Sequence, residues 1–123
     1  MIFSRGLIYK LVQGSVSVTD AVADATIIAA PGAGKKIVIT KAILTIHTAA
    51  VGGAGVLQLE NGLNGTAFAV TEGDAITAQP QVFDFGEEGY ELSENTLLNL
   101  TTVGAVTTQA SGSAVVIGYI TNA

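Results

Sequence analysis

The chain has 123 residues and no cysteine, which fits a single domain and excludes disulfide bonds and thiolate metal sites. Charged residues make up 12 % of the chain, against about 25 % in a typical soluble domain, while apolar residues reach 49 %. Ten acidic and five basic residues leave a net charge of −5, and the bases form no stripe with aromatic side chains, which argues against binding to nucleic acid or to an anionic membrane.

Residues 1–14 predict either an N-terminal arm or a first strand, ahead of a β-sandwich domain over 15–123. This segment carries Arg5 and Lys10, two of the five bases, among apolar residues, whereas all ten acids lie further along the chain. A cationic, apolar arm on an acidic body suits docking on another protein surface. The candidate docking residues are Ile2, Phe3, Arg5, Leu7, Ile8 and Lys10. Charges interrupt any apolar core of a signal peptide, so we expect the protein to be made in a cytoplasm.

The remainder predicts an all-β fold, an antiparallel two-sheet sandwich of the jelly-roll kind. Apolar runs are short, turn signals recur about every 8 to 12 residues, and no stretch sustains a helical period. A jelly roll and an immunoglobulin-like topology cannot be separated by this pattern. Strands are expected over 24–30, 36–48, 56–60, 66–71, 81–85, 96–102 and 113–121.

The longest predicted strand, 36–48, has apolar residues on both faces, and Thr40 and Lys41 interrupt the alternation. Such a strand is either buried on both faces or broken by a β-bulge near Thr40 and Lys41. Further along, alternation places pairs of apolar side chains inward. These are Leu57 with Leu59, Phe68 with Val70, Phe83 with Phe85, and Leu98 with Leu100.

The last predicted strand is also apolar on both faces, which indicates either a central position in a sheet or a subunit interface. Val115, Ile117 and Tyr119 lie on one side, with Val116 and Ile120 on the other. We expect a homotrimer in which Val116 or Ile120 contacts a sister subunit. The lone histidine, His47, is expected at the surface or in the same interface.

Motifs that could carry chemistry are weak. The sequence 32–36 (GAGKK) lacks the first glycine and the Ser or Thr of a phosphate-binding loop, so we expect a tight loop entering a strand. Five acids between 84 and 94 could offer oxygens to Ca²⁺, but they match no EF-hand spacing, and the glycines among them favour solvated turns. No nucleophile–base pair stands out, so we expect no enzyme, no metal, no cofactor and no small-molecule substrate.

Three segments in order carry a resemblance to a known class of protein. They are GKKIVI at 34–39, YELSENTLLNL at 90–100 and VVIGYI at 115–120. This order resembles small tailed-bacteriophage virion proteins of the trimeric jelly-roll capsid decoration, or cement, type, over roughly residues 25–122. The resemblance implies a protein without catalytic residues that works on the outer capsid surface.

The leading hypothesis is therefore a structural virion protein that decorates and stabilises an icosahedral phage capsid by binding across subunits of the major capsid protein. The alternative is a carbohydrate- or receptor-binding module of a phage tail or fibre, since jelly rolls serve both purposes. Sugar sites usually contain exposed aromatic side chains, and the chain has three tyrosines and no tryptophan. The sequence therefore favours the first hypothesis.

Overall fold

A computed structural model describes residues 10–18, 24–48, 55–73, 80–103 and 111–123, and within these residues the fold consists of nine strands without a helix. Sheet A contains β1 (Lys10–Val18), β9 (Ser111–Asn122), β3 (Lys35–Thr48), β6 (Gln81–Asp84) and β7 (Tyr90–Glu91). Sheet B contains β2 (Asp24–Ile28), β8 (Leu98–Val103), β4 (Gly55–Asn61) and β5 (Thr66–Gly73). The described part of the chain accordingly has no helix that could cross a membrane.

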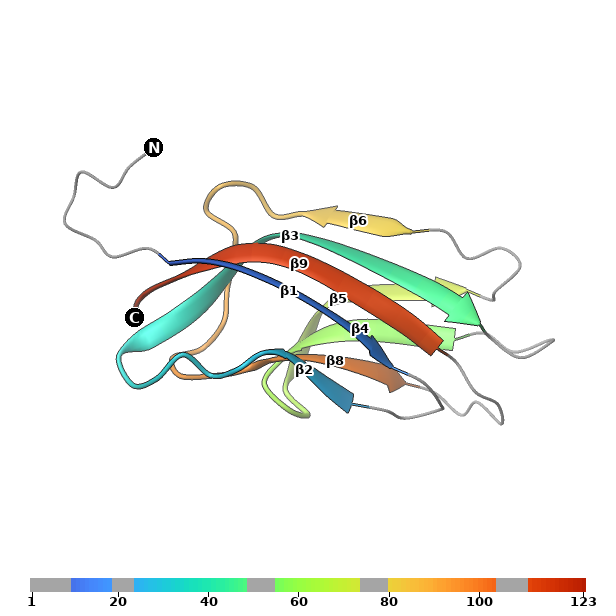
Figure 1. Cartoon of the computed structure of the whole chain (residues 1–123), viewed down its shortest axis with the longest axis horizontal. Coiled ribbons are helices and arrows are strands. Elements are labelled where there is room, and N and C mark those ends of the chain that lie inside the picture. Colours follow the sequence, from blue (N-terminus) through green and yellow to red (C-terminus); the bar gives the residue numbers. More distant parts are fainter. Residues whose placement is uncertain (1–9, 19–23, 49–54, 74–79, 104–110) are drawn as a thin grey trace.

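The two sheets form separate layers, with sheet A above sheet B in Figure 1. Every pairing is antiparallel. One set of pairings is nested: β1 pairs with β9, β2 with β8, β3 with both β6 and β7, and β4 with β5. The pairings of β3 with β9 and of β4 with β8 join these pairs within each sheet. The chain thus resembles one long hairpin that is folded over itself. The prediction of an all-β, antiparallel two-sheet sandwich is confirmed.

Strand β3 contains a β-bulge, which is one of the two alternatives that its sequence offers. Its register against β9 steps from Ile39 to Lys41, so Thr40 is the additional residue. A single extra residue reverses which positions face the core. Ile37 and Ile39 are fully buried before the bulge, and Ala42 and Leu44 are fully buried after it. The bulge therefore explains why the apolar pattern changes face in the middle of this strand.

The core lies between the sheets and consists of aliphatic side chains from the central strands. Leu57 and Leu59 of β4 and Leu98 and Leu100 of β8 are buried, as predicted. The prediction for β5 was wrong at Val70, which is 44 % exposed. The register shift between Leu59 and Glu60 makes Phe68 an additional residue, and this places Ala69 in the core instead.

Aromatic side chains close one side of the sandwich, where β5 of sheet B approaches β6 and β7 of sheet A. The ring of Phe68 stacks on that of Tyr90, with centroids 4.1 Å apart and planes 6° apart. Phe85 lies 5.8 Å from Phe68 and 6.4 Å from Phe83 between ring centroids. Because Phe68 belongs to one sheet and Tyr90 to the other, this stacking joins the two layers directly.

Strand β1 begins at Lys10 and continues to Val18, so it crosses the boundary that we predicted between residues 14 and 15. It lies at the edge of sheet A, where Lys10 is opposite Ile120 and Val18 is opposite Gly112. The first-strand alternative therefore applies to residues 10–14. The predicted docking residues Ile2, Phe3, Arg5, Leu7 and Ile8 lie outside the described residues.

Candidate protein-binding face

The outer face of sheet A carries apolar side chains on three neighbouring strands. In β9, Ala114 and Val116 are fully buried, so the residues that alternate with them point away from the core. Val115 is 38 % exposed and Ile117 is 47 % exposed. Strand pairing places Ile43 of β3 opposite Val115. Val115 and Ile117 are therefore exposed on this face of the described residues, and Ile43 is half-buried beside them.

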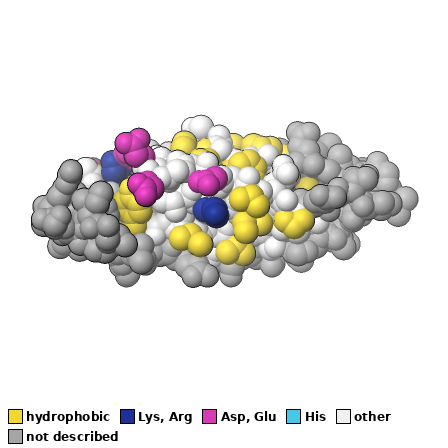
Figure 2. All heavy atoms as spheres, turned by 90° about the horizontal axis from the view of Figure 1, so that it is seen from above, with side chains coloured by type: hydrophobic (Ala, Val, Ile, Leu, Met, Phe, Trp, Pro, Cys, Tyr) yellow, Lys and Arg dark blue, Asp and Glu magenta, His cyan; other side chains and the backbone are white. Residues whose placement is uncertain are grey.

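The same face continues onto β6 and includes two charges. Val82 is opposite Ile43 and is 60 % exposed. Lys41 lies between Ile117 on β9 and Asp84 on β6, and both charged residues are exposed. We call the set Lys41, Ile43, Val82, Asp84, Val115 and Ile117 the sheet A face. Figure 2 views the molecule from this side and shows hydrophobic side chains gathered there, with charged side chains beside them.

The outer face of sheet B has a different chemistry. Asn99 of β8 is 1 % exposed, and its side-chain amide donates hydrogen bonds of 3.0 Å to Oδ1 of Asp24 and to Oε1 of Glu60. Gln58 donates to the other carboxylate oxygen of Glu60 over 3.1 Å. Polar side chains that bond one another along the sheet thus replace the apolar strip found on sheet A.

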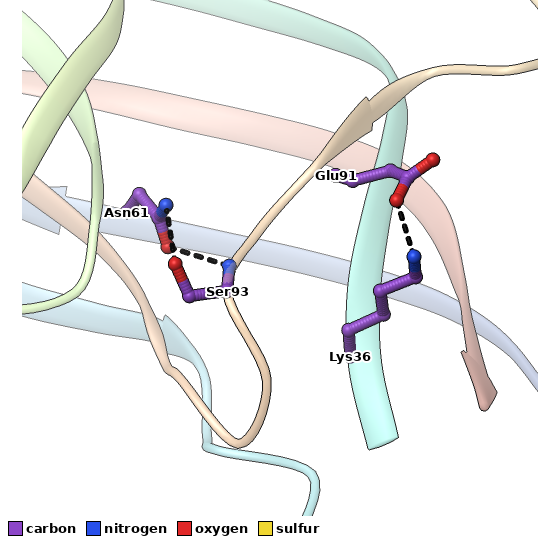
Figure 3. A network of polar contacts seen from close by, with 4 residues as sticks. All are labelled: Lys36, Asn61, Glu91 and Ser93. Atoms are coloured by element: carbon purple, nitrogen blue, oxygen red, sulfur yellow. Dashed lines mark hydrogen bonds and ion pairs between the residues drawn. The ribbon is translucent and has the colours of Figure 1, made fainter. Parts of the chain in front are cut away.

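One end of the sandwich is held together by polar contacts between separate loops (Figure 3). Asn61 and Ser93 exchange two hydrogen bonds, since the backbone amide of Ser93 donates to Oδ1 of Asn61 over 3.1 Å and Nδ2 of Asn61 lies 3.2 Å from the Ser93 hydroxyl oxygen. Lys36 of β3 forms an ion pair with Glu91 of β7. The contact between Asn61 and Ser93 ties sheet B to the segment that joins β7 to β8, and the ion pair joins two strands of sheet A.

The glycine-rich loop before β3 is a structural turn, as the sequence predicts. Gly32 and Gly34 have φ angles of 109° and 78°, which glycine adopts without steric cost. The backbone amide of Gly34 donates to Oε2 of Glu94 over 2.7 Å, and that of Gly32 donates to Oδ1 of Asn95 over 2.9 Å. Side chains of the chain itself therefore occupy the amides that a phosphate would use.

The acids between 84 and 94 lie apart and serve different local contacts. Glu91 pairs with Lys36, Glu94 accepts from Gly34, and Asp84 accepts a 2.9 Å bond from the backbone amide of Gly86. Within the described ranges, no three carboxylate or imidazole side chains come close enough to hold a metal ion.

The predicted subunit-interface residues fall in different places. Val116 is fully buried between the sheets and has no surface to offer a second subunit, so its assignment is corrected to the core. Ile120 is half-buried and packs against the same core. The backbone of His47 lies in β3 where the register shifts between Ile46 and Thr48, and its side chain is outside the described set. The alternation of apolar residues in the sequence assigns each residue of β9 to one of two faces, but it does not show which face points toward the core.

Comparison with known proteins identified no matching family model and no matching curated protein. Weak structural likenesses exist to two solved chains. One is from Bacillus endospore appendages, described as a family of disulfide-linked pili: its TM-score is 0.46 at 13 % identity, and the match covers 94 % of this chain and 89 % of that chain. The other is from the virus-like particle of extra small virus of the giant freshwater prawn Macrobrachium rosenbergii: its TM-score is 0.39 at 13 % identity, with 89 % and 79 % covered.

Proposed function

We propose that this protein is a structural virion protein that decorates an icosahedral phage capsid and stabilises it by binding across capsid subunits. The observation that carries the proposal is the sheet A face, where Val82 of β6 and Val115 and Ile117 of β9 remain exposed on either side of β3. An exposed apolar strip on a chain with few charges suits a protein that works against another protein surface. The sequence resemblance to capsid decoration proteins supplies the identity of the assembly.

The strand order supports the same proposal. Nested pairing of first with last and second with next-to-last strand is the order expected of a jelly roll when β6 and β7 are counted as one interrupted strand. Jelly rolls serve in viral capsids and in lectins, so the order alone does not choose between shell protein and sugar-binding module. Tyr90 stacks on Phe68 inside the aromatic cluster, which makes this ring a poor platform for a sugar.

Stabilisation of the shell would follow from mass action. A protein that binds the assembled shell and not its free subunits stabilises the shell by about RT ln(1 + [L]/Kd), which is about 2.7 kcal/mol at a free concentration one hundred times Kd. No catalytic group is required for this effect.

The test is co-sedimentation of the purified protein with undecorated phage heads, combined with the temperature at which the heads disassemble. We expect saturable binding and a rise in that temperature. Because β1 spans Lys10–Val18, the docking segment is best tested by removing residues 2–9, which leaves every described strand intact. The shortened protein should lose binding to heads and keep its melting temperature. Absence of binding by the full chain at tens of micromolar would contradict the proposed function.

A further inference from the structure

The sheet A face is suited to a specific occupant. We infer that a second copy of this chain packs on it face to face, about a two-fold axis. This inference goes beyond the proposed function: it takes the same face as a protein-binding surface and adds the identity of the partner there, which leaves contact with the capsid to other parts of the chain, such as residues 2–9.

The contrast between the two outer faces supports an interface on sheet A. On sheet B, the side chains of Gln58, Glu60 and Asn99 satisfy one another through hydrogen bonds. On sheet A, Val82 of β6 and Val115 and Ile117 of β9 are between 38 % and 60 % exposed. Ile43 of the intervening strand β3 lies opposite both Val82 and Val115. Adjacent strands lie about 4.8 Å apart, so these side chains form a continuous strip. Two such strips can pack on each other as the inner faces of a sandwich do.

The two charges on the strip make it complementary to itself. Lys41 and Asp84 are direct neighbours across β3 and β6, and both are exposed. Among the described residues, Lys36 forms an ion pair with Glu91, whereas Lys41 and Asp84 do not form one with each other. In a two-fold contact, if one residue of the first copy meets a second residue on the other copy, then the same two residues also meet with the copies exchanged. Lys41 of one copy can then face Asp84 of the second copy, and the reverse contact follows from the symmetry.

This arrangement differs from the homotrimer expected from the sequence. That expectation placed Val116 and Ile120 in the interface, and both pack against the core. A patch that binds the same patch on another copy is fully used once two copies have associated. A ring of three copies needs two different patches on each copy. The exposed face therefore favours a pair of chains.

Sedimentation equilibrium of the full chain, without phage heads, tests the inference. We expect the mass of two chains at tens of micromolar. Ile117→Asp places an unpaired charge in the strip and should raise the dissociation constant at least one hundred-fold. Val70→Asp is the matched control, since Val70 is 44 % exposed on sheet B, and it should leave the pair unchanged. A single-chain mass for the natural protein, or equal effects of both substitutions, would overturn the inference.

A charge exchange tests the two-fold geometry itself. Lys41→Glu makes the face wholly acidic and Asp84→Lys makes it wholly basic, so each variant alone should associate at least ten-fold more weakly than the natural chain. Mixing the two variants should restore association as a pair containing one chain of each. If the substitutions weakened association only by disturbing each chain's own fold, mixing the two variants would not restore it. Failure of the mixture to associate would therefore overturn the two-fold contact.

The two proposals fail in different ways. A natural chain that stays single in solution and still co-sediments with heads would overturn the pair and leave the capsid function standing. A chain that forms pairs but does not bind heads would overturn the capsid function and leave the pair standing.

Discussion

Asn99 shows at the scale of a single residue how a polar group is accommodated beside a sheet. Its amide is 1 % exposed and donates to two carboxylates, from Asp24 and Glu60. A buried amide without partners would cost about 1–3 kcal/mol, and here both of its donors are satisfied. The same amide separates two negative charges that would otherwise face each other across β8.

Replacing Asn99 by Asp should destabilise the protein by about 3–5 kcal/mol at pH 7, because a third carboxylate would lie between the other two. Like charges raise the pKa of the introduced carboxyl above its usual value of about 3.9. The folded state then binds the proton more tightly than the unfolded state, so the deficit should grow as pH rises and shrink toward acid. Urea denaturation between pH 4 and pH 8 measures this.

Asn99→Ala is the matched control, since it removes the same hydrogen bonds without adding a charge. Its deficit should be about 2 kcal/mol, with a weaker dependence on pH. Equal pH dependence in the two variants would show that charge repulsion at this position is unimportant.

At the scale of an element, the bulge in β3 determines the packing of its neighbour β9. Gly118 is opposite Ile39, directly before the bulge, and a Cβ atom there would lie 2.1 Å from the carbonyl oxygen of Val38. Real atoms cannot approach so closely, so the two strands would have to separate. Gly118→Ala should lower the free energy of unfolding, measured by thermal denaturation, by about 3 kcal/mol. Val70→Ala, at an exposed position of β5 outside the sheet A face, should cost less than about 1 kcal/mol of unfolding free energy.

The aromatic cluster is the element-scale link between the sheets. Tyr90→Ala removes the ring that stacks on Phe68 and leaves a gap between β5 and β7. The expected loss is about 3–5 kcal/mol of unfolding free energy, measured by urea denaturation. Tyr90→Phe retains the ring and should lose less than about 1.5 kcal/mol. A similar loss for both substitutions would assign the effect to the hydroxyl group instead.

At the scale of the whole molecule, the strand order makes the folding of the first strand depend on the last strand. Strand β9 lies between β1 and β3 in sheet A and pairs with both. Removing residues 117–123 would leave nearly half of β1 without its strand partner and the first half of β3 without its pairing to β9. We expect this truncation to lack a cooperative thermal transition by circular dichroism. Removing only residues 122–123, which are exposed, should retain the transition. A cooperative transition in the longer truncation would show that sheet A folds without a complete β9.

Local patterns in the sequence were sufficient for the class of fold, most strand positions, the bulge near Thr40 and the turn at 32–34. Each depends on neighbouring residues: alternation follows from the strand period, and glycine accepts a positive φ wherever it occurs. The faces of β5 and β9 depended on tertiary structure. Val70 faces outward because a register shift against β4 inserts Phe68, and Val116 faces inward because the second sheet covers that side of β9. The sheet A face likewise joins residues from β3, β6 and β9 that are distant in sequence, and strand pairing alone brings them onto one surface.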